Sequence, residues 1–496
     1  MPQQLSPNRQ LRKLLVQASW TGQDLATAVN AIGRETSLAL RYDRSAVAHW
    51  LAGTRPRPSA AALIAEALSR RLGRTITQEH LGFTTSPGAA SSRSTAPGAA
   101  ERPGTQDEEE SVTTLVRLAQ AQTAPDHRRR QLLVGLGYSL TALAVPGFDS
   151  RPAPDAPARD APAQDPLAQA ALAQAARVPR SRADKVTLFE VEAAEALAVH
   201  FRAGDAAFGG GHGRRALAAY LASDLAPRLR RPASPAVRSR LLAAAGRLAY
   251  LCAFMCFDDE LHGYAQRYYR VALRLATENR DALDYAVALR GMSVQARVLG
   301  HYHQAVELAE AAAANTPGQP LRQAFVHGQL AVAAAADRDP HRALAAIGTA
   351  ERFLDRATGP QTQLTGAYHW SSLLHQQGTV RELLGDRAGA IGALRESLRH
   401  RPTAERRSRA VILAELAELQ LDEGRLDQAV ATWNQFLDEY PTLASARSDT
   451  AVAILRARVR PHGRNPAARA LLERTAVLAA PRPHPRRVGA SPVRVT

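Results

Sequence analysis

The sequence predicts an all-α protein, and its composition carries that prediction. Hydrophobic residues make up 45% of the 496 residues, but only 5% are aromatic, and alanine and leucine supply most of the apolar content. Both are strong helix formers, whereas the β-branched residues that favour strands are comparatively scarce. No segment alternates apolar and polar residues in the sustained way that indicates a half-buried strand. A chain of this length has room for roughly two to four domains.

The charge of the chain favours an anionic partner. The formal net charge is +17 and the isoelectric point is about 10.7. Residues 1–83 carry eleven Arg and Lys against five Asp and Glu, and residues 453–496 carry ten Arg against one Glu. Nucleic acid is the commonest partner of so basic a protein. Genomic base composition is the competing source of this bias, because Arg, Ala, Gly and Pro all have GC-rich codons.

Shifts in composition divide the chain into domains and linkers. Residues 84–110 combine Pro, Gly, Ser and Ala with a final acidic run, and too few of them are apolar to offset the cost of ordering. We predict an N-terminal helical domain at 1–83, flexible linkers at 84–110 and 148–166, a helical segment at 111–147, a helical region at 167–240, helical repeats at 241–445, and a basic, partly disordered tail at 446–496.

The N-terminal domain is predicted to contain four helices and a short fifth element. Thr21 and Asp24 form a near capping box for the second helix, and Asp43 caps the third, which stops at Gly53 before two prolines. Ser59 caps the fourth helix. The predicted helices cover 8–19, 21–33, 44–52 and 59–73, and the fifth element covers 77–83.

This succession resembles the helix-turn-helix domain of phage-repressor-like regulators. The likeness is carried by the small Ala26 in the second helix, the run "SAVAHWLAG" at 45–53, and the prolines beyond it. In that family the third helix enters the major groove. The resemblance implies that Arg44 and Ser45 face base edges, with His49 at the groove margin. It implies phosphate contacts for Arg41, Arg55, Arg57, Thr21 and Gln23, and a domain core that contains Leu25, Ala26, Val47 and Trp50.

Two departures from the family affect the register on DNA. Leu25 and Trp50 are 25 positions apart, a wider spacing than in the family, so residues 31–42 contain an insertion. Gly22 stands where the family commonly has glutamine. The competing interpretation of the third helix is an ordinary amphipathic helix whose arginines are solvated.

Helical repeats are predicted in the second half of the chain. In residues 409–441, small residues at Ala410, Ala417 and Ala429 precede Trp433 and Phe436, a spacing that resembles the tetratricopeptide repeat. The small residue recurs at Ala265, Ala305, Ala343, Ala390 and Ala429, at intervals of 40, 38, 47 and 39 residues. These intervals exceed the tetratricopeptide period of ~34, so we expect five stacked hairpins with lengthened turns. The alternative is a generic helical bundle with alanine-rich interfaces.

The whole arrangement resembles actinobacterial regulators that join such a domain to tetratricopeptide-type repeats and control sporulation or antibiotic production. The segments "LRYDRSAVAHWLAGTRPRP", "LIAEALSRRLGR", "RRQLLVGLGYSL" and "FGGGHGRRALAAYL" carry this likeness. It implies a cytoplasmic transcription regulator, often a repressor, that binds double-stranded DNA. We expect a homodimer whose repeat groove holds a peptide, a small molecule or another protein.

Other classes of function find little support in the sequence. It contains no G-x-x-x-x-G-K-[ST], G-x-S-x-G or H-E-x-x-H motif, so we expect no enzyme activity, cofactor or metal. Cys252 and Cys256 are predicted to be buried, and the glycine cluster at 208–215 is predicted to form a tight turn rather than an anion site around Arg214. The apolar run within 128–147 is shorter than a bilayer span of ~20 residues and is predicted to be a buried helix. The competing function is a scaffold or adaptor with only non-specific affinity for nucleic acid.

Overall fold

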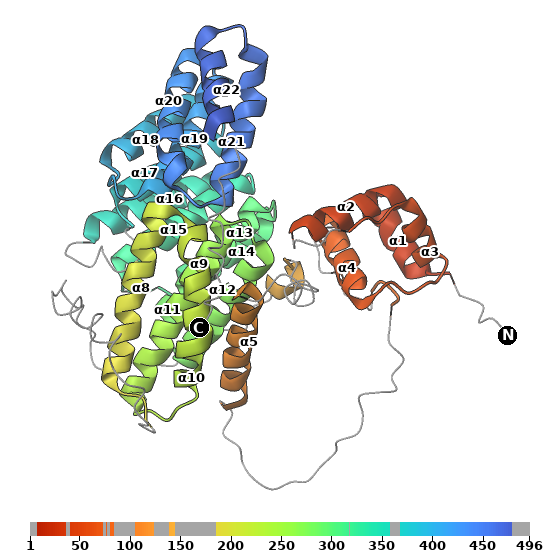
Figure 1. The fold of residues 1–496 in the computed structure, drawn as a ribbon, viewed down its shortest axis with the longest axis vertical. Helices are drawn as coiled ribbons and strands as arrows, with labels where there is room; N and C mark the ends of the chain where they lie inside the picture. The colour runs from red at the N-terminus through yellow and green to blue at the C-terminus, as the bar shows by residue number, and fades with distance from the viewer. Residues whose placement is uncertain are drawn as a thin grey trace, which may run out of the picture.

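The computed structural model describes residues 7–35, 40–72, 76, 80–83, 105–123, 138–143, 185–316, 318–357 and 368–478. Every regular element in these ranges is helical, which confirms the all-α prediction. The helices form a small N-terminal domain and a long series of paired helices (Figure 1).

The N-terminal domain packs four helices around one apolar core. These are α1 (Arg9–Ala18), α2 (Gly22–Glu35), α3 (Arg44–Leu51) and α4 (Pro58–Leu72). Leu11, Leu25, Val47 and Leu68 are each fully buried and bring one side chain from each helix into the same cluster. Of the predicted fifth element, residues 80–83 are described, and they begin with a turn.

Five helix pairs make up the repeat region, as the five predicted hairpins require. Ala265, Ala305, Ala343, Ala390 and Ala429 are all buried in the second helix of a pair, and each such helix packs on its partner. The pairs are α11 (Pro235–Asp258) with α12 (His262–Glu278), α13 (Ala282–Val298) with α14 (Tyr302–Ala314), α15 (Pro320–Ala336) with α16 (Pro340–Arg356), α17 (Trp370–Leu383) with α18 (Arg387–His400), and α19 (Arg406–Asp422) with α20 (Leu426–Glu439).

A helix that precedes these pairs contacts both the first pair and the last one. Helix α8 (Leu188–Phe208) packs on both α11 and α19, and Arg407 of α19 pairs with the buried Asp205 of α8 at 3.2 Å. Ala444, which follows α20, donates its N–H to the carbonyl of Phe208 at 2.7 Å. Helix α8, which precedes the repeats, is therefore joined directly to the fifth pair and to the chain that follows it.

The glycine cluster makes this junction possible. Gly209 has a φ of +82°, and helix α9 (Gly210–Tyr220) starts directly after it. A Cβ on Gly210 would lie 2.5 Å from the carbonyl oxygen of Met255, and one on Gly209 would lie 2.7 Å from that of Ala444. Without side chains, Gly209 and Gly210 let the start of α9 pack directly against the backbone of Met255 and Ala444. Arg214 pairs with Asp259 at 2.9 Å and donates to Gln122 at 2.9 Å.

Two predicted boundaries are wrong. Helix α5 (Thr105–Thr123) takes the acidic end of the predicted linker 84–110 as its first turns, because carboxylates are favoured at a helix N-terminus and Glu110 pairs with Arg274 at 3.1 Å. The predicted tail at 446–496 begins with two packed helices, α21 (Ala446–Val459) on α19 and α22 (Pro466–Leu478) on α20. The predicted linker at 148–166, most of the apolar run within 128–147, and residues 479–496 lie outside the described residues.

Short elements complete the chain: the 3₁₀ turns Leu140–Leu143, Tyr440–Thr442 and Arg460–His462, the π-helical turn Leu221–Leu225, and α10 (Ala226–Leu229). Within the described ranges, α11 is the one helix long and apolar enough to cross a membrane, and neighbouring helices bury most of it. Its Cys252 and Cys256 are buried and unpaired by a disulfide. No group of three potential metal ligands occurs among the described residues.

The pair between α8 and α19 generates a stability prediction. Burial raises the pKa of Asp205 to about 6, and Arg407 opposes that rise. Arg407→Ala leaves a buried carboxylate without its partner, so we expect the free energy of unfolding to fall by about 3–5 kcal/mol at pH 7. Because the pKa of Asp205 is higher in the folded chain than in the unfolded one, protonation of Asp205 at pH 5 should restore part of the lost free energy of unfolding. Thermal denaturation at both pH values measures this.

The matched control is Arg387→Ala, which removes an exposed arginine that lies 3.9 Å from Glu423. Exposed ion pairs contribute little to stability, so its melting temperature should stay near that of the unaltered chain. Equal melting temperatures for the two variants at pH 7 would contradict the structural role of Arg407.

Candidate nucleic-acid interface

Helix α3 is fixed in place by its N-cap and by its buried face. The Asp43 carboxylate accepts the N–H of Ala46 at 2.9 Å and the hydroxyl of Ser45 at 2.7 Å, and these bonds lower the pKa of Asp43. Val47 and Trp50 point into the core with exposed fractions of 0% and 5%. The opposite face of α3 is therefore held outward.

The structure separates the predicted residues into a buried and an exposed set. Leu25, Ala26, Val47 and Trp50 are buried in the domain core. All eight predicted DNA-contacting residues are exposed: Thr21, Gln23, Arg41, Arg44, Ser45, His49, Arg55 and Arg57. The Ser45 hydroxyl is already a donor to Asp43, so a base contact by Ser45 would compete with the cap.

Gly22 brings the start of α2 against α3. A Cβ on Gly22 would lie 3.5 Å from Val47 and 3.8 Å from the side chain of Arg44. The N-terminus of α2, with Thr21 as its cap, is thus next to Arg44. Thr21 and Asp24 bond reciprocally, since Thr21 donates its N–H to the carboxylate at 2.8 Å and the Asp24 N–H donates back at 3.2 Å.

Asn30 anchors the inserted residues and was not singled out by the sequence pattern. Its side chain accepts the N–H of Tyr42 at 2.9 Å and donates to the carbonyl of Tyr42 at 2.7 Å. The Tyr42 ring then meets Trp50 edge-on, with ring centroids 5.1 Å apart. Asn30 therefore fixes the approach to α3 from the insertion, although helix α2 continues to Glu35.

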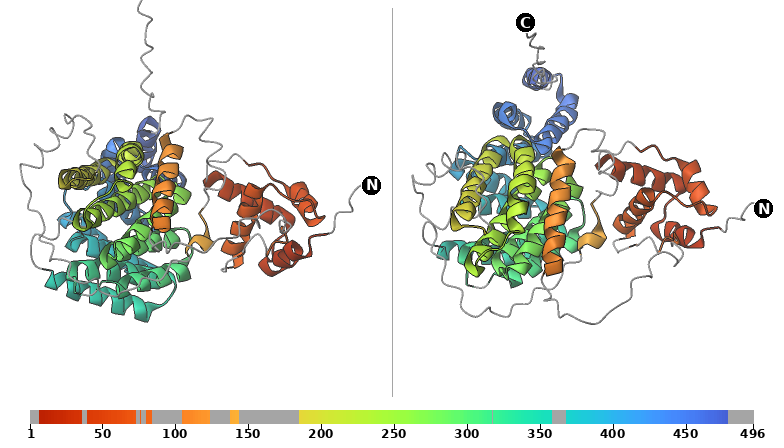
Figure 2. Two further views of the ribbon diagram at one scale, coloured as in Figure 1. Left: turned by 90° about the horizontal axis from the view of Figure 1, so that it is seen from below. Right: turned by 60° about the horizontal axis from the view of Figure 1, so that its bottom comes forward.

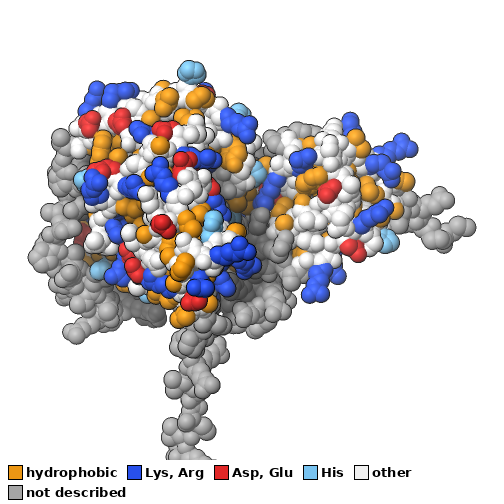
Figure 3. Space-filling view, turned by 90° about the horizontal axis from the view of Figure 1, so that it is seen from above, with side chains coloured by type: hydrophobic (Ala, Val, Ile, Leu, Met, Phe, Trp, Pro, Cys, Tyr) orange, Lys and Arg blue, Asp and Glu red, His pale blue; other side chains and the backbone are white. Residues whose placement is uncertain are grey.

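The exposed face of α3 lies away from the repeats. Figure 1 places α4 between the repeat region and α3, and Figure 2 shows the N-terminal domain beside the repeats from two further directions. In the space-filling view, Lys and Arg side chains stand on the outer surface of this domain (Figure 3). Arg9 is an exposed arginine to which the sequence pattern gave no role. The neighbouring Asn8 donates its N–H to the carbonyl of Leu51, at the end of α3, at 2.9 Å.

Charged side chains also gather on the first helices of the repeat pairs. Arg247 of α11 and Arg322 of α15 lie 3.0 Å and 3.7 Å from the carboxylate of Asp284 on α13. Arg290 of α13 stands over the ring of Phe325, 3.8 Å from its centroid. These helices pack on one another, α11 on α13 and α13 on α15.

Residues 11–84 match the SP15 N-terminal domain. The match begins in α1 and extends beyond α4, so it covers the helices that carry the exposed residues described above. A comparison with curated proteins found no match. Among solved structures, a human IFIT1 dimer with PPP-AAAA is similar at 15% identity and a TM-score of 0.34, over 58% of this chain and 68% of that chain.

The contact between Asn30 and Tyr42 generates a prediction about α3. Asn30→Ala removes two hydrogen bonds, each worth about 0.5–1.5 kcal/mol, so the free energy of local opening at α3 should fall by about 1–3 kcal/mol. Hydrogen exchange of the Arg44–Leu51 amides measures it. Thr27→Ala is the control, since Thr27 is exposed on the same helix and its hydroxyl accepts a long hydrogen bond from the side chain of Gln23 at 3.5 Å. Equal exchange in both variants would show that Asn30 does not fix α3.

Proposed function

We propose that this chain is a sequence-specific DNA-binding regulator of transcription, a repressor, that reads the major groove with α3. The observation that carries the proposal is the division of α3 into a buried and an exposed face. Val47 and Trp50 hold the helix to the domain, while Arg44 and His49 are exposed to solvent. An arginine at this place can donate to both O6 and N7 of a guanine.

The residues around α3 support contacts to the DNA backbone. Arg41 precedes the helix, and Arg55 and Arg57 follow it, so exposed guanidinium groups lie at both ends. The N-terminus of α2, near Thr21 and Gln23, offers backbone N–H groups of the kind that bind phosphate. Phosphate contacts position the domain, and base contacts by Arg44 specify the sequence.

We further propose that the repeat region binds an effector and that the chain acts as a homodimer. A peptide, a small molecule or a protein bound by the repeats would change the arrangement of the two N-terminal domains. Because a dimer reads two half-sites at a fixed spacing, such a change alters affinity for DNA through linkage. The match to the SP15 N-terminal domain is compatible with this proposal and does not extend to the repeats.

The decisive experiment selects bound sequences from a random duplex pool at physiological salt. We expect the full-length chain to enrich a defined motif. Arg44→Ala should weaken binding to that motif by about 1–3 kcal/mol and relax the base preference at one of its positions. Arg57→Ala is the matched control. It should weaken binding to all sequences about equally and reduce the slope of log affinity against log salt concentration by about one unit.

Failure of this experiment has a defined meaning. If no motif is enriched and binding depends only on salt, the chain is an adaptor that binds nucleic acid without sequence preference. If a motif is enriched but Arg44→Ala reads it unchanged, the proposed register of α3 on DNA is wrong.

A further inference from the structure

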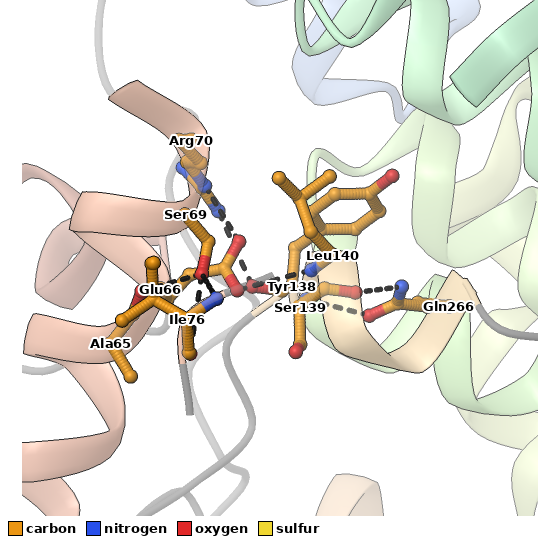
Figure 4. Close-up of polar contacts among 9 residues, drawn as sticks. All are labelled: Ala65, Glu66, Ser69, Arg70, Ile76, Tyr138, Ser139, Leu140 and Gln266. Atoms are coloured by element: carbon orange, nitrogen blue, oxygen red, sulfur yellow. Dashed lines mark hydrogen bonds and ion pairs between the residues drawn. The ribbon is translucent and has the colours of Figure 1, made fainter. Parts of the chain in front are cut away.

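Three residues, Tyr138, Ser139 and Leu140, lie between the N-terminal domain and the repeat region (Figure 4). On the domain side, Glu66 of α4 accepts the N–H of Leu140 at 3.1 Å, and Arg70 of α4 donates to the carbonyl of Tyr138 at 3.4 Å. On the repeat side, Gln266 of α12 bonds Ser139 twice: it accepts the N–H at 2.8 Å and donates to the carbonyl at 2.7 Å.

Both sides of this contact are buried. Glu66 is 5% exposed and Gln266 is 2% exposed, although each is a polar side chain. A buried polar group is costly unless it is hydrogen-bonded. Here Glu66 uses its second oxygen on the Nε of Arg70 at 2.9 Å, and Gln266 uses both of its polar atoms on Ser139. Separation of the two parts would therefore leave Glu66 and Gln266 without the partners they have on Ser139 and Leu140.

The ring of Tyr138 adds a second contact between the two parts. Tyr138 is 1% exposed. Its ring stacks on the imidazole of His301, the residue before α14, with centroids 5.6 Å apart and planes 3° from parallel. The Arg70 guanidinium lies 5.7 Å from the centroid of the same ring, within cation–π range. One aromatic side chain thus contacts a cation of the N-terminal domain and a side chain of the second repeat pair.

We propose that Tyr138–Leu140 is a latch that holds the N-terminal domain in one orientation on the repeats. The domain side of the contact consists of Glu66 and Arg70 of α4 (Figure 4), so the latch orients the domain through α4, while Arg44 and His49 of α3 stay exposed. Gln266 and His301 belong to the first two repeat pairs, which makes these pairs the part of the repeats that acts on the domain.

The latch gives the repeats a physical route to the N-terminal domain. A ligand that shifts α12 against α14 would move Gln266 relative to His301, and the latch cannot follow both. Such a ligand would release the domain, and by reciprocity a fixed domain would change the affinity of the repeats for that ligand. This consequence for DNA rests on the proposed function, whereas the latch itself does not.

The experiment measures the distance between the two parts in the full chain. Spin labels are placed through Val16→Cys on α1, where the side chain is 75% exposed, and Glu307→Cys on α14, where it is 63% exposed. The native cysteines are buried. Double electron–electron resonance then reports the distribution of distances. We expect one narrow distribution in the labelled chain and a broad one after Tyr138→Ala or Gln266→Met.

Tyr138→Ala removes a ring that belongs to the buried apolar cluster of the repeat region, so it also removes packing. Gln266→Met keeps the side-chain volume while it removes both bonds to Ser139, so its distribution tests the latch without that loss of packing. Tyr302→Ala is the control, because Tyr302 is 45% exposed and follows His301 directly; its distribution should stay narrow. A broad distribution in the labelled chain itself, or no broadening in either latch variant, would overturn the proposal. Since no DNA is present, this outcome is independent of whether α3 reads a sequence.

Discussion

The close approach of neighbouring helices at small residues, within a pair and between pairs, is the constraint on which the repeat region depends. A Cβ on Gly378 of α17 would lie 2.7 Å from Leu394 of its partner α18. One on Gly291 of α13 would lie 2.5 Å from the ring of Tyr269 on α12, a helix of the preceding pair. Larger residues at these places would force the helices apart. Because each pair packs on the next, one displaced helix would shift the pairs that follow. The contacts of Asp205 with Arg407 and of Phe208 with Ala444 depend on that accumulated geometry.

The same packing gives the N-terminal domain a fixed support. Gln266 and His301 keep their positions only as long as the first two pairs stay stacked, and both residues contact the segment that meets Glu66 and Arg70. The domain in turn has its own core, so α3 does not rely on the repeats for its fold. We infer a division of roles. The N-terminal domain forms the exposed face of α3, and the repeats fix the orientation of that face through Tyr138–Leu140.

Local signals predicted most of the elements and few of the contacts between them. Asp43 as an N-cap, the buried pair Val47 and Trp50, and the buried alanines of the repeats follow from patterns within one or two helical turns. Asn30 could not be found in this way, because its partner Tyr42 lies twelve positions away, at the far end of the inserted stretch. Gln266 and Ser139 are 127 positions apart, and nothing in either local sequence indicates the other. The folded part of the basic tail could not be predicted because charge and proline obscured the apolar residues of α21 and α22, which pack on α19 and α20.

Whether α3 enters the major groove is the central claim, and methylation interference tests it most directly. Dimethyl sulfate modifies guanine N7 in the major groove and adenine N3 in the minor groove of a duplex that the full-length chain binds. If α3 reads the major groove, guanine N7 methylation at a few discrete positions should prevent binding, since an arginine that reads guanine needs that atom free. Interference confined to adenine N3, or none at any position, would contradict major-groove reading by α3.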